Sequence, residues 1–157
     1  AVIDLQLAGG FLAIYHEMDE NDVINILKHP ESMIETDGDL VDPASDVFPH
    51  PRAFGSFPRV LAKYVRELKV ITLEQAIQKM TSMPANQIKQ YDLGRISEGT
   101  YADLVVFDEN KIQDKATYTN SRQFAEGIEY MVINGKFVIH NSKLTVNTPG
   151  RWIRSEH

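Results

Sequence analysis

Cysteine is absent from the 157 residues, which excludes a disulfide framework and thiolate ligation of a metal within this chain. Basic residues are few: 16 lysines and arginines face 22 acidic residues, giving a formal net charge of −6, whereas a nucleic-acid partner would need a basic face. Long apolar runs and the basic start of a signal peptide are also missing. We therefore expect no nucleic-acid or membrane partner and a cytoplasmic protein.

Several ready-made active-site motifs are missing as well. The sequence has no P-loop, no dinucleotide-binding glycine fingerprint and no Gly-x-Ser-x-Gly elbow. Its five histidines include neither a His-x-His nor a His-x-x-x-His pair, so the chain lacks a self-contained metal site. Because the chain starts with alanine and enters an apolar segment at once, we interpret it as a piece of a longer protein.

What is present is the composition of a soluble globular protein, with 43% apolar and 24% charged residues. A short apolar run at 11–15 predicts a strand, and a helix is expected between Asp19 and Pro30. Residues 32–36 predict a second buried strand. This order is typical of a βαβ unit, in which functional polar groups follow the carboxyl ends of the strands.

Three further helices are predicted in the middle of the chain. Ser56 is expected to cap the first, with Pro58 in its first turn. Thr72 and Gln75 form a capping box for the second, and Pro84 opens a short third helix. The front half of the chain is therefore expected to be α/β.

From about residue 93 the pattern changes to β. Residues 103–108 predict a strand, and Asn134-Gly135 between two apolar runs is the strongest short signal for a hairpin. Residues 109–128 between them are expected to be an irregular polar connector, and the tail after 141 shows only weak patterning.

Asp37 and Arg52 are the leading candidates for chemistry. Asp37 follows a predicted strand end and suits a general base or metal ligand, although Asp-Gly is also a common turn pair. Arg52 can pair bidentately with a carboxylate or can be an ordinary surface arginine. His50 can be a ligand, a proton shuttle or a loop residue, and its place before proline requires an extended backbone.

The remaining histidines carry weaker signals. His16 lies at the expected end of the first strand, although a lone histidine is more often structural. His29 is at a helix end, where it suits the helix dipole. We treat the last two, His140 and His157, as background.

Three stretches together carry a family resemblance. They are residues 15–20 (Tyr-His-Glu-Met-Asp-Glu), Asp37-Gly38 with the His-Pro-Arg to Phe-Pro-Arg block at 50–59, and residues 99–108 (Gly-Thr-Tyr-Ala-Asp-Leu-Val-Val-Phe-Asp). From about Leu5 to Arg154 the chain resembles the C-terminal part of N-acyl-D-amino-acid deacylases, or D-aminoacylases, in the amidohydrolase superfamily. The 99–108 stretch supports the superfamily, and the 50–59 block is more specific to the deacylases.

The resemblance implies an α/β fold: a metal-dependent (β/α)8 barrel joined to a small β-sandwich. Residues 1–92 would be the last strands and helices of the barrel, and residues 93–157 the returning sandwich strands. The reaction implied is hydrolysis of a small N-acyl-D-amino acid to a carboxylate and a D-amino acid with zinc as cofactor. Most zinc ligands of the family lie upstream of Ala1, so an upstream segment or second polypeptide would complete the barrel, and the isolated chain would be inactive.

The resemblance also implies roles for four residues. Asp37 would match the catalytic acid, which contacts the metal and carries a proton from water to the leaving amine. Arg52 would hold the α-carboxylate of the substrate, while His50 and Gly38 would shape the loop. The chain departs from the family at Thr36, where serine is common, and in its longer loop at 39–49.

Two rival functions remain open at the level of sequence. One is another amidohydrolase that acts on cyclic amides, similar to a hydantoinase or dihydroorotase. The other is a catalytically silent piece that serves as a scaffold or assembly module.

Overall fold

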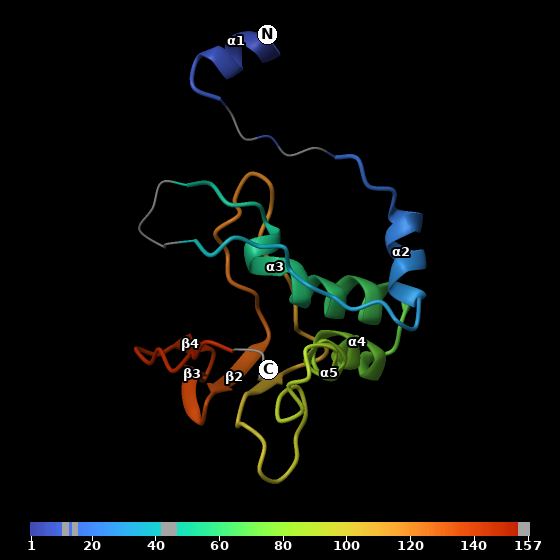
Figure 1. The fold of residues 1–157 in the computed structure, drawn as a ribbon, viewed down its shortest axis with the longest axis vertical. Helices are drawn as coiled ribbons and strands as arrows, with labels where there is room; N and C mark the ends of the chain where they lie inside the picture. Colours follow the sequence, from blue (N-terminus) through green and yellow to red (C-terminus); the bar gives the residue numbers. More distant parts are fainter. Residues whose placement is uncertain (11–12, 14–15, 42–46, 154–157) are drawn as a thin grey trace.

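Helices occupy the first ninety residues of the structure and strands the last fifty (Figure 1). The structure is a computed structural model that describes residues 1–10, 13, 16–41 and 47–153. The helices are α1 (Val2–Leu7), α2 (Glu20–Lys28), α3 (Arg52–Arg59), the π-helix η1 (Val60–Glu67), α4 (Leu73–Met80) and α5 (Ser82–Gln87). The strands are β1 (Leu104–Phe107), β2 (Ile128–Ile133), β3 (Lys136–His140) and β4 (Lys143–Leu144).

Two of the predicted helix starts are confirmed, each with a polar cap. The Asp19 carboxylate accepts from the backbone N–H of Asn21 at 2.7 Å, at the start of α2. At α4 the Thr72 hydroxyl accepts from the Gln75 N–H at 3.2 Å, and the Gln75 side chain accepts from the Thr72 N–H at 2.9 Å. Local side-chain chemistry is thus sufficient to fix these two boundaries.

The predicted start of α3 is wrong. The helix begins at Arg52 rather than at Ser56, because Pro51 already has helical φ and ψ angles of −52° and −26°. Ser56 lies inside the helix, where its hydroxyl donates to the Arg52 carbonyl at 2.9 Å. Pro58 also lies inside α3, which then continues as the wider π-helix η1.

The strand predicted at 32–36 is also wrong. This segment has no regular secondary structure and pairs with no strand, and its side chains alternate between half-buried and exposed rather than being buried. Its backbone is held by a helix instead, because the Ile34 N–H donates to the Lys79 carbonyl at 3.1 Å. Of the expected strand at 11–15 only Ala13 is described, so that prediction lies outside the described residues. The predicted βαβ unit is wrong, because its helix is present as α2 but its second strand at 32–36 does not form.

The strands form one antiparallel sheet in the order β1-β2-β3-β4. The predicted hairpin is confirmed: Asn134 and Gly135 both have positive φ, at 49° and 76°, which the tight turn between β2 and β3 requires. The strand at 103–108 is confirmed as β1, and the connector after it is irregular as predicted. The short strand β4 was not predicted.

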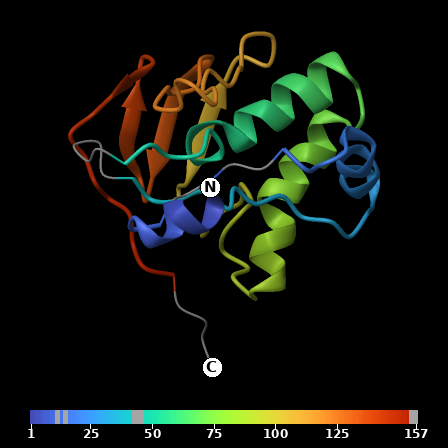
Figure 2. The same ribbon diagram turned by 90° about the horizontal axis from the view of Figure 1, so that it is seen from above.

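The core lies among α2, η1, α4 and the connector, to one side of the sheet (Figure 2). Its buried side chains are Leu27, Val60, Leu61, Tyr64, Ile71, Ala76 and Ile112. One lysine is buried beside it: Lys79 is 4% exposed, and its ammonium donates to the carbonyls of His29 and Ser32 at 2.5 and 2.8 Å. Among the described helices, none combines the length and apolar character needed to cross a bilayer.

Candidate functional site

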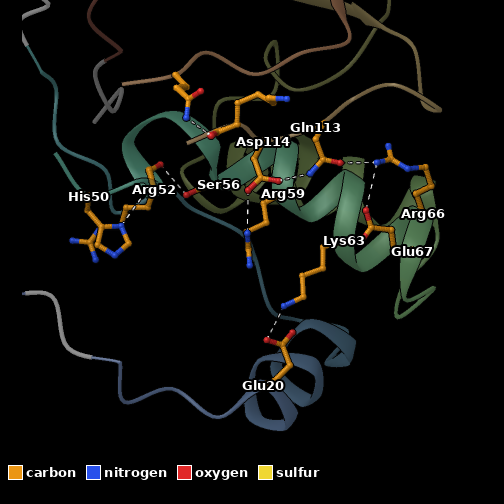
Figure 3. Close-up of polar contacts among 12 residues, drawn as sticks. Glu20, His50, Arg52, Ser56, Arg59, Lys63, Arg66, Glu67, Gln113 and Asp114 are labelled. Atoms are coloured by element: carbon orange, nitrogen blue, oxygen red, sulfur yellow. Dashed lines mark hydrogen bonds and ion pairs between the residues drawn. The ribbon is translucent and has the colours of Figure 1, made fainter. Parts of the chain in front are cut away.

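The helix pair α3–η1 presents four basic side chains, which together bind three other segments of the chain; Figure 3 draws all four. Arg52 binds the loop at Asp37, Arg59 and Arg66 bind the connector, and Lys63 binds the start of α2. The Lys63 ammonium lies 2.8 Å from the Glu20 carboxylate. Arg66 donates to the carbonyls of Ile112 and Glu109 at 2.7 and 3.2 Å.

The two leading candidates from the sequence meet at the start of α3. The Arg52 guanidinium lies 2.9 Å from the Asp37 carboxylate, with 43% and 71% of the two side chains exposed. Asp37 has a φ of 44°, a left-handed conformation that turns the chain toward the helix. The Asp37 carboxylate is therefore accessible and faces a positive charge.

Gly38 makes this approach possible. A Cβ atom built on Gly38 would lie 2.8 Å from the Cα of Ala53 and 3.3 Å from the Arg52 carbonyl oxygen. The Gly38 N–H donates to the Thr36 hydroxyl at 3.2 Å, and the Ser56 hydroxyl reaches the Thr36 carbonyl at 3.4 Å. The loop at 36–38 is thus packed directly onto the first turn of α3.

His50 is half-buried beside the same turn. Its Nδ1 accepts from the backbone N–H of Arg52 at 3.1 Å, so the ring proton of the neutral form is on Nε2. Burial lowers the pKa of His50, and the charges of Arg52 and His16 lower it further against an opposing effect of Asp37. The geometry therefore favours a neutral His50 at pH 7.

A pocket of about 340 Å³ opens at this position. It is lined by two stretches that are far apart in the sequence, one within residues 50–59 and the other within residues 114–118. Arg52 and His50 line it from α3 and the residues before it, and Tyr118 lines it from the connector. The site thus has a wall that the sequence patterns did not predict.

An ion pair holds this second wall against α3. Asp114, only 9% of whose side chain is exposed, lies 3.0 Å from the Arg59 guanidinium and also accepts from the Gln113 amide at 2.9 Å. Burial lowers the pKa of Arg59, but the hydrogen bond and charge of Asp114 outweigh it and leave the pKa raised. Gly55 lets the two segments touch, because a Cβ there would lie 3.1 Å from the Cβ of Asp114.

Tyr118 brings two of the histidines together. Its ring meets His16 and His50 edge to face, with ring centroids 4.6 and 5.4 Å apart. His29 lies away from this group, and its Nδ1 accepts from the Glu31 N–H at 3.3 Å. His140 packs on Phe137 in the hairpin, as expected for a background residue, and His157 lies outside the described residues.

A complete metal site does not form from the residues the structure describes. They contain no cluster of three or more histidine, aspartate or glutamate side chains that could hold a metal ion. The Asp37 carboxylate pairs with the Arg52 cation, and a second carboxylate at the pocket, Asp114, pairs with Arg59. The described residues thus bring together too few ligands for a metal site of their own.

Comparison with known proteins finds a family and several relatives. The profile described as "Amidohydrolase family" matches residues 21–139. N-acyl-D-glutamate deacylase of Alcaligenes xylosoxydans xylosoxydans is 42% identical over 144 residues, which are 92% of this chain and 28% of that protein. The chain thus spans less than a third of the length of this relative.

Two solved structures are similar in fold as well as in sequence. A D-aminoacylase described as having a binuclear metal centre gives a TM-score of 0.77 at 40% identity, covering 85% of this chain and 27% of that one. N-acyl-D-glutamate deacylase from Bordetella bronchiseptica, solved with zinc and a phosphonate inhibitor, gives 0.71 at 41% identity, covering 77% and 25%.

Proposed function

Because this chain belongs to the amidohydrolase family, we propose that it is the C-terminal part of an enzyme that hydrolyses N-acyl-D-amino acids to a carboxylate and a D-amino acid. The named relatives support a linear amide substrate rather than a cyclic one, and the alternative of a cyclic amidase is not favoured. The protein that contains this chain together with its upstream residues is called the complete enzyme below.

The observation that carries the proposal is the pair formed by Asp37 and Arg52 beside the pocket. A hydrolase for an N-acyl amino acid needs a base near the amide and a cation for the α-carboxylate. These two groups lie 2.9 Å apart at the start of α3, and Arg52 lines a pocket of about 340 Å³. The pocket volume is in the range of small-molecule sites.

The proposed mechanism gives each of the two residues one task. Arg52 leaves Asp37 and takes the α-carboxylate of the substrate in a charge-assisted fork. The freed Asp37 carboxylate accepts a proton from the attacking water and returns it to the nitrogen of the leaving amine. Gly38 keeps the loop close to α3, and neutral His50 shapes the loop by accepting from the Arg52 backbone N–H.

We also propose the larger architecture that the resemblance implies. Residues 1–92 would contribute the last strands and helices of a (β/α)8 barrel, and residues 93–157 strands of a small β-sandwich. The match to D-aminoacylase over 85% of this chain supports this assignment. An upstream segment or a second polypeptide would supply the rest of the barrel.

Zinc is part of the proposal because a solved relative holds zinc. The described residues do not fit a whole zinc site, since no three of their histidine, aspartate and glutamate side chains come together. The other ligands would lie in the upstream segment or second polypeptide, and no step of the proposed mechanism is assigned to the metal. Sites in which zinc acts in catalysis need three protein ligands.

The test is a substrate comparison with the complete, zinc-loaded enzyme. We expect free amine to be released from N-acetyl-D-glutamate or N-acetyl-D-leucine and not from their L enantiomers. A cyclic amide such as dihydroorotate serves as the control and should remain intact. Ring opening of the cyclic amide alone would support the rival amidase, and no hydrolysis of any substrate would support a silent structural piece.

A further inference from the structure

The connector between β1 and β2 is fixed to the helices at its start. Arg66 donates to the carbonyl of Ile112 at 2.7 Å and to the amide oxygen of Gln113 at 2.9 Å. Asp114, the next residue, binds Arg59 at 3.0 Å. Three successive connector residues are thus held by two arginines, so the chain that follows starts from a fixed position.

The connector then folds back on itself before it returns to the sheet. The Thr117 N–H donates to the Asn120 carbonyl at 3.0 Å, and the Thr117 hydroxyl accepts from the Asn120 N–H at the same distance. The Gln123 amide donates to the carbonyls of Lys115 and Asn120 at 2.6 and 2.9 Å. These bonds close a tight loop, and Tyr118 lies at its turn.

Tyr118 is placed as a binding residue rather than as a core residue. Its side chain lines the pocket with Arg52, and 49% of the residue is exposed. The ring is held by His16 and His50, yet its hydroxyl forms a hydrogen bond with none of the described residues. A phenol hydroxyl can donate one hydrogen bond.

The substrate carboxylate expected in this pocket can accept more hydrogen bonds than Arg52 donates. A carboxylate has about four lone-pair positions, and a fork from Arg52 uses two of them. A second donor in the same pocket would therefore find a charged acceptor. Hydrogen bonds to charged groups contribute more than those between neutral groups.

We propose that Tyr118 is a substrate-binding residue whose hydroxyl donates to the carboxylate held by Arg52, and that the Arg59–Asp114 pair positions it. This inference rests on the proposed function, because it takes an N-acyl amino acid as the ligand. It assigns the connector a part in substrate recognition, in addition to the part proposed for Arg52 of α3.

The test removes one oxygen atom from the complete enzyme. Tyr118→Phe keeps the ring contacts with the two histidines and should raise the KM for N-acetyl-D-leucine about tenfold or more, with kcat nearly unchanged. With N-acetyl-D-leucinamide, which lacks the carboxylate, the variant and wild type should have the same KM. Tyr91→Phe is the matched control, because Tyr91 is exposed and lies outside the lining of this pocket.

Calorimetric titration of the metal-free protein with N-acetyl-D-leucine gives a readout that is independent of turnover. The Kd should rise by the same factor as the KM in Tyr118→Phe. An unchanged Kd and KM, or an equal loss with the acid and the amide, would overturn the inference while the proposed function stands. Failure of the wild type to hydrolyse N-acyl-D-amino acids would overturn both.

The positioning role has its own test in a double-mutant cycle. Asp114→Asn should raise the KM for the acid, and in the Tyr118→Phe background it should add little, because the hydroxyl that it positions is already gone. Fully additive losses would show that Asp114 acts independently of Tyr118 and would overturn this part of the inference.

Discussion

The Arg52 guanidinium neutralises the Asp37 carboxylate across 2.9 Å, although the two residues are proposed to act on different parts of the substrate. The substrate carboxylate must therefore compete with Asp37 for the same guanidinium. In the proposed mechanism, binding of the substrate and release of the base are therefore one event. A base that is paired until the substrate arrives becomes free only when there is a substrate to act on.

Substitution of the two partners should separate binding from chemistry. Asp37→Asn removes the base and should lower kcat at least about a hundredfold, the range for loss of general base catalysis. Arg52→Lys keeps the charge but loses the fork, so it should mainly raise KM. Steady-state kinetics of the complete enzyme with N-acetyl-D-leucine measure both effects. Near-normal turnover in Asp37→Asn would remove the assignment of the base.

A methyl group at Gly38 should push the loop away from α3. The added Cβ would meet the Ala53 Cα at 2.8 Å, and backbone cannot move aside as a flexible side chain can. We expect Gly38→Ala to lower the free energy of unfolding by about 1–3 kcal/mol, the usual cost of overpacking, and to lower kcat/KM. Gly150→Ala is the control, because no atom lies within 4 Å of its added Cβ. Equal melting temperatures for the two variants would contradict the close packing.

The contact of α2 with η1 should weaken in acid. The hydrogen bond from Lys63 holds the pKa of Glu20 below its ordinary value of 4.5. A lowered folded pKa means that the stabilisation is present above about pH 4.5 and is lost as the pH falls through the folded pKa. Lys63 has a raised pKa for the same reason, so its contribution is lost at the alkaline end, above its ordinary 10.5.

Urea unfolding between pH 2 and pH 7 measures this effect in the complete enzyme. In Glu20→Gln the free energy of unfolding should fall by about 0.5 kcal/mol less between pH 7 and pH 2 than in the wild type, since that is the usual contribution of a solvent-exposed ion pair. Glu31→Gln is the control, since the Glu31 carboxylate forms no ion pair with the residues described. If the free energy of unfolding fell equally with pH in the wild type and in Glu20→Gln, the ion pair would contribute nothing to stability.

His50 should titrate below the ordinary histidine value of 6.5, because burial and the charge of Arg52 both disfavour the imidazolium. Arg52→Met removes that charge and should raise the pKa of His50, whereas Asp37→Asn removes an opposing charge and should lower it. Histidine resonances followed by NMR against pH give the pKa of His50 in the wild type and in the two variants. A folded pKa that is lowered also means that stability rises with pH up to about 6.5. The reverse order of the two variants would contradict the arrangement of charges.

Local signals in the sequence predicted those parts of the fold that are built from neighbouring residues. The capping box at Thr72 and Gln75 and the turn at Asn134-Gly135 are complete within four residues, and both are confirmed. The segment at 32–36 has the composition of a strand, but a strand also needs a partner. Lys79 binds this segment through its carbonyl and its ammonium group, and neither contact is a strand ladder, so the segment belongs to no sheet.

The site was predictable in part for the same reason. Asp37 and Arg52 carry recognisable local signals, and the structure brings them together, while their roles stay predictions. The wall at 114–118 was missed because its position depends on a contact between Arg59 and Asp114, which are 55 residues apart. Gly55 was the local sequence signal for this contact, because it leaves room for Asp114. A single glycine in a helix has many explanations, however, so it does not predict a contact by itself.

The four basic side chains of α3–η1 also have a consequence for cooperativity. Together they tie three stretches of chain to the same helix pair, so displacement of the helices would release the loop at 36–38, the start of α2 and the connector together. In hydrogen-exchange terms these stretches would share one opening reaction instead of opening one by one. A destabilising substitution in η1 would thus disturb the pocket, although no residue of η1 lines it.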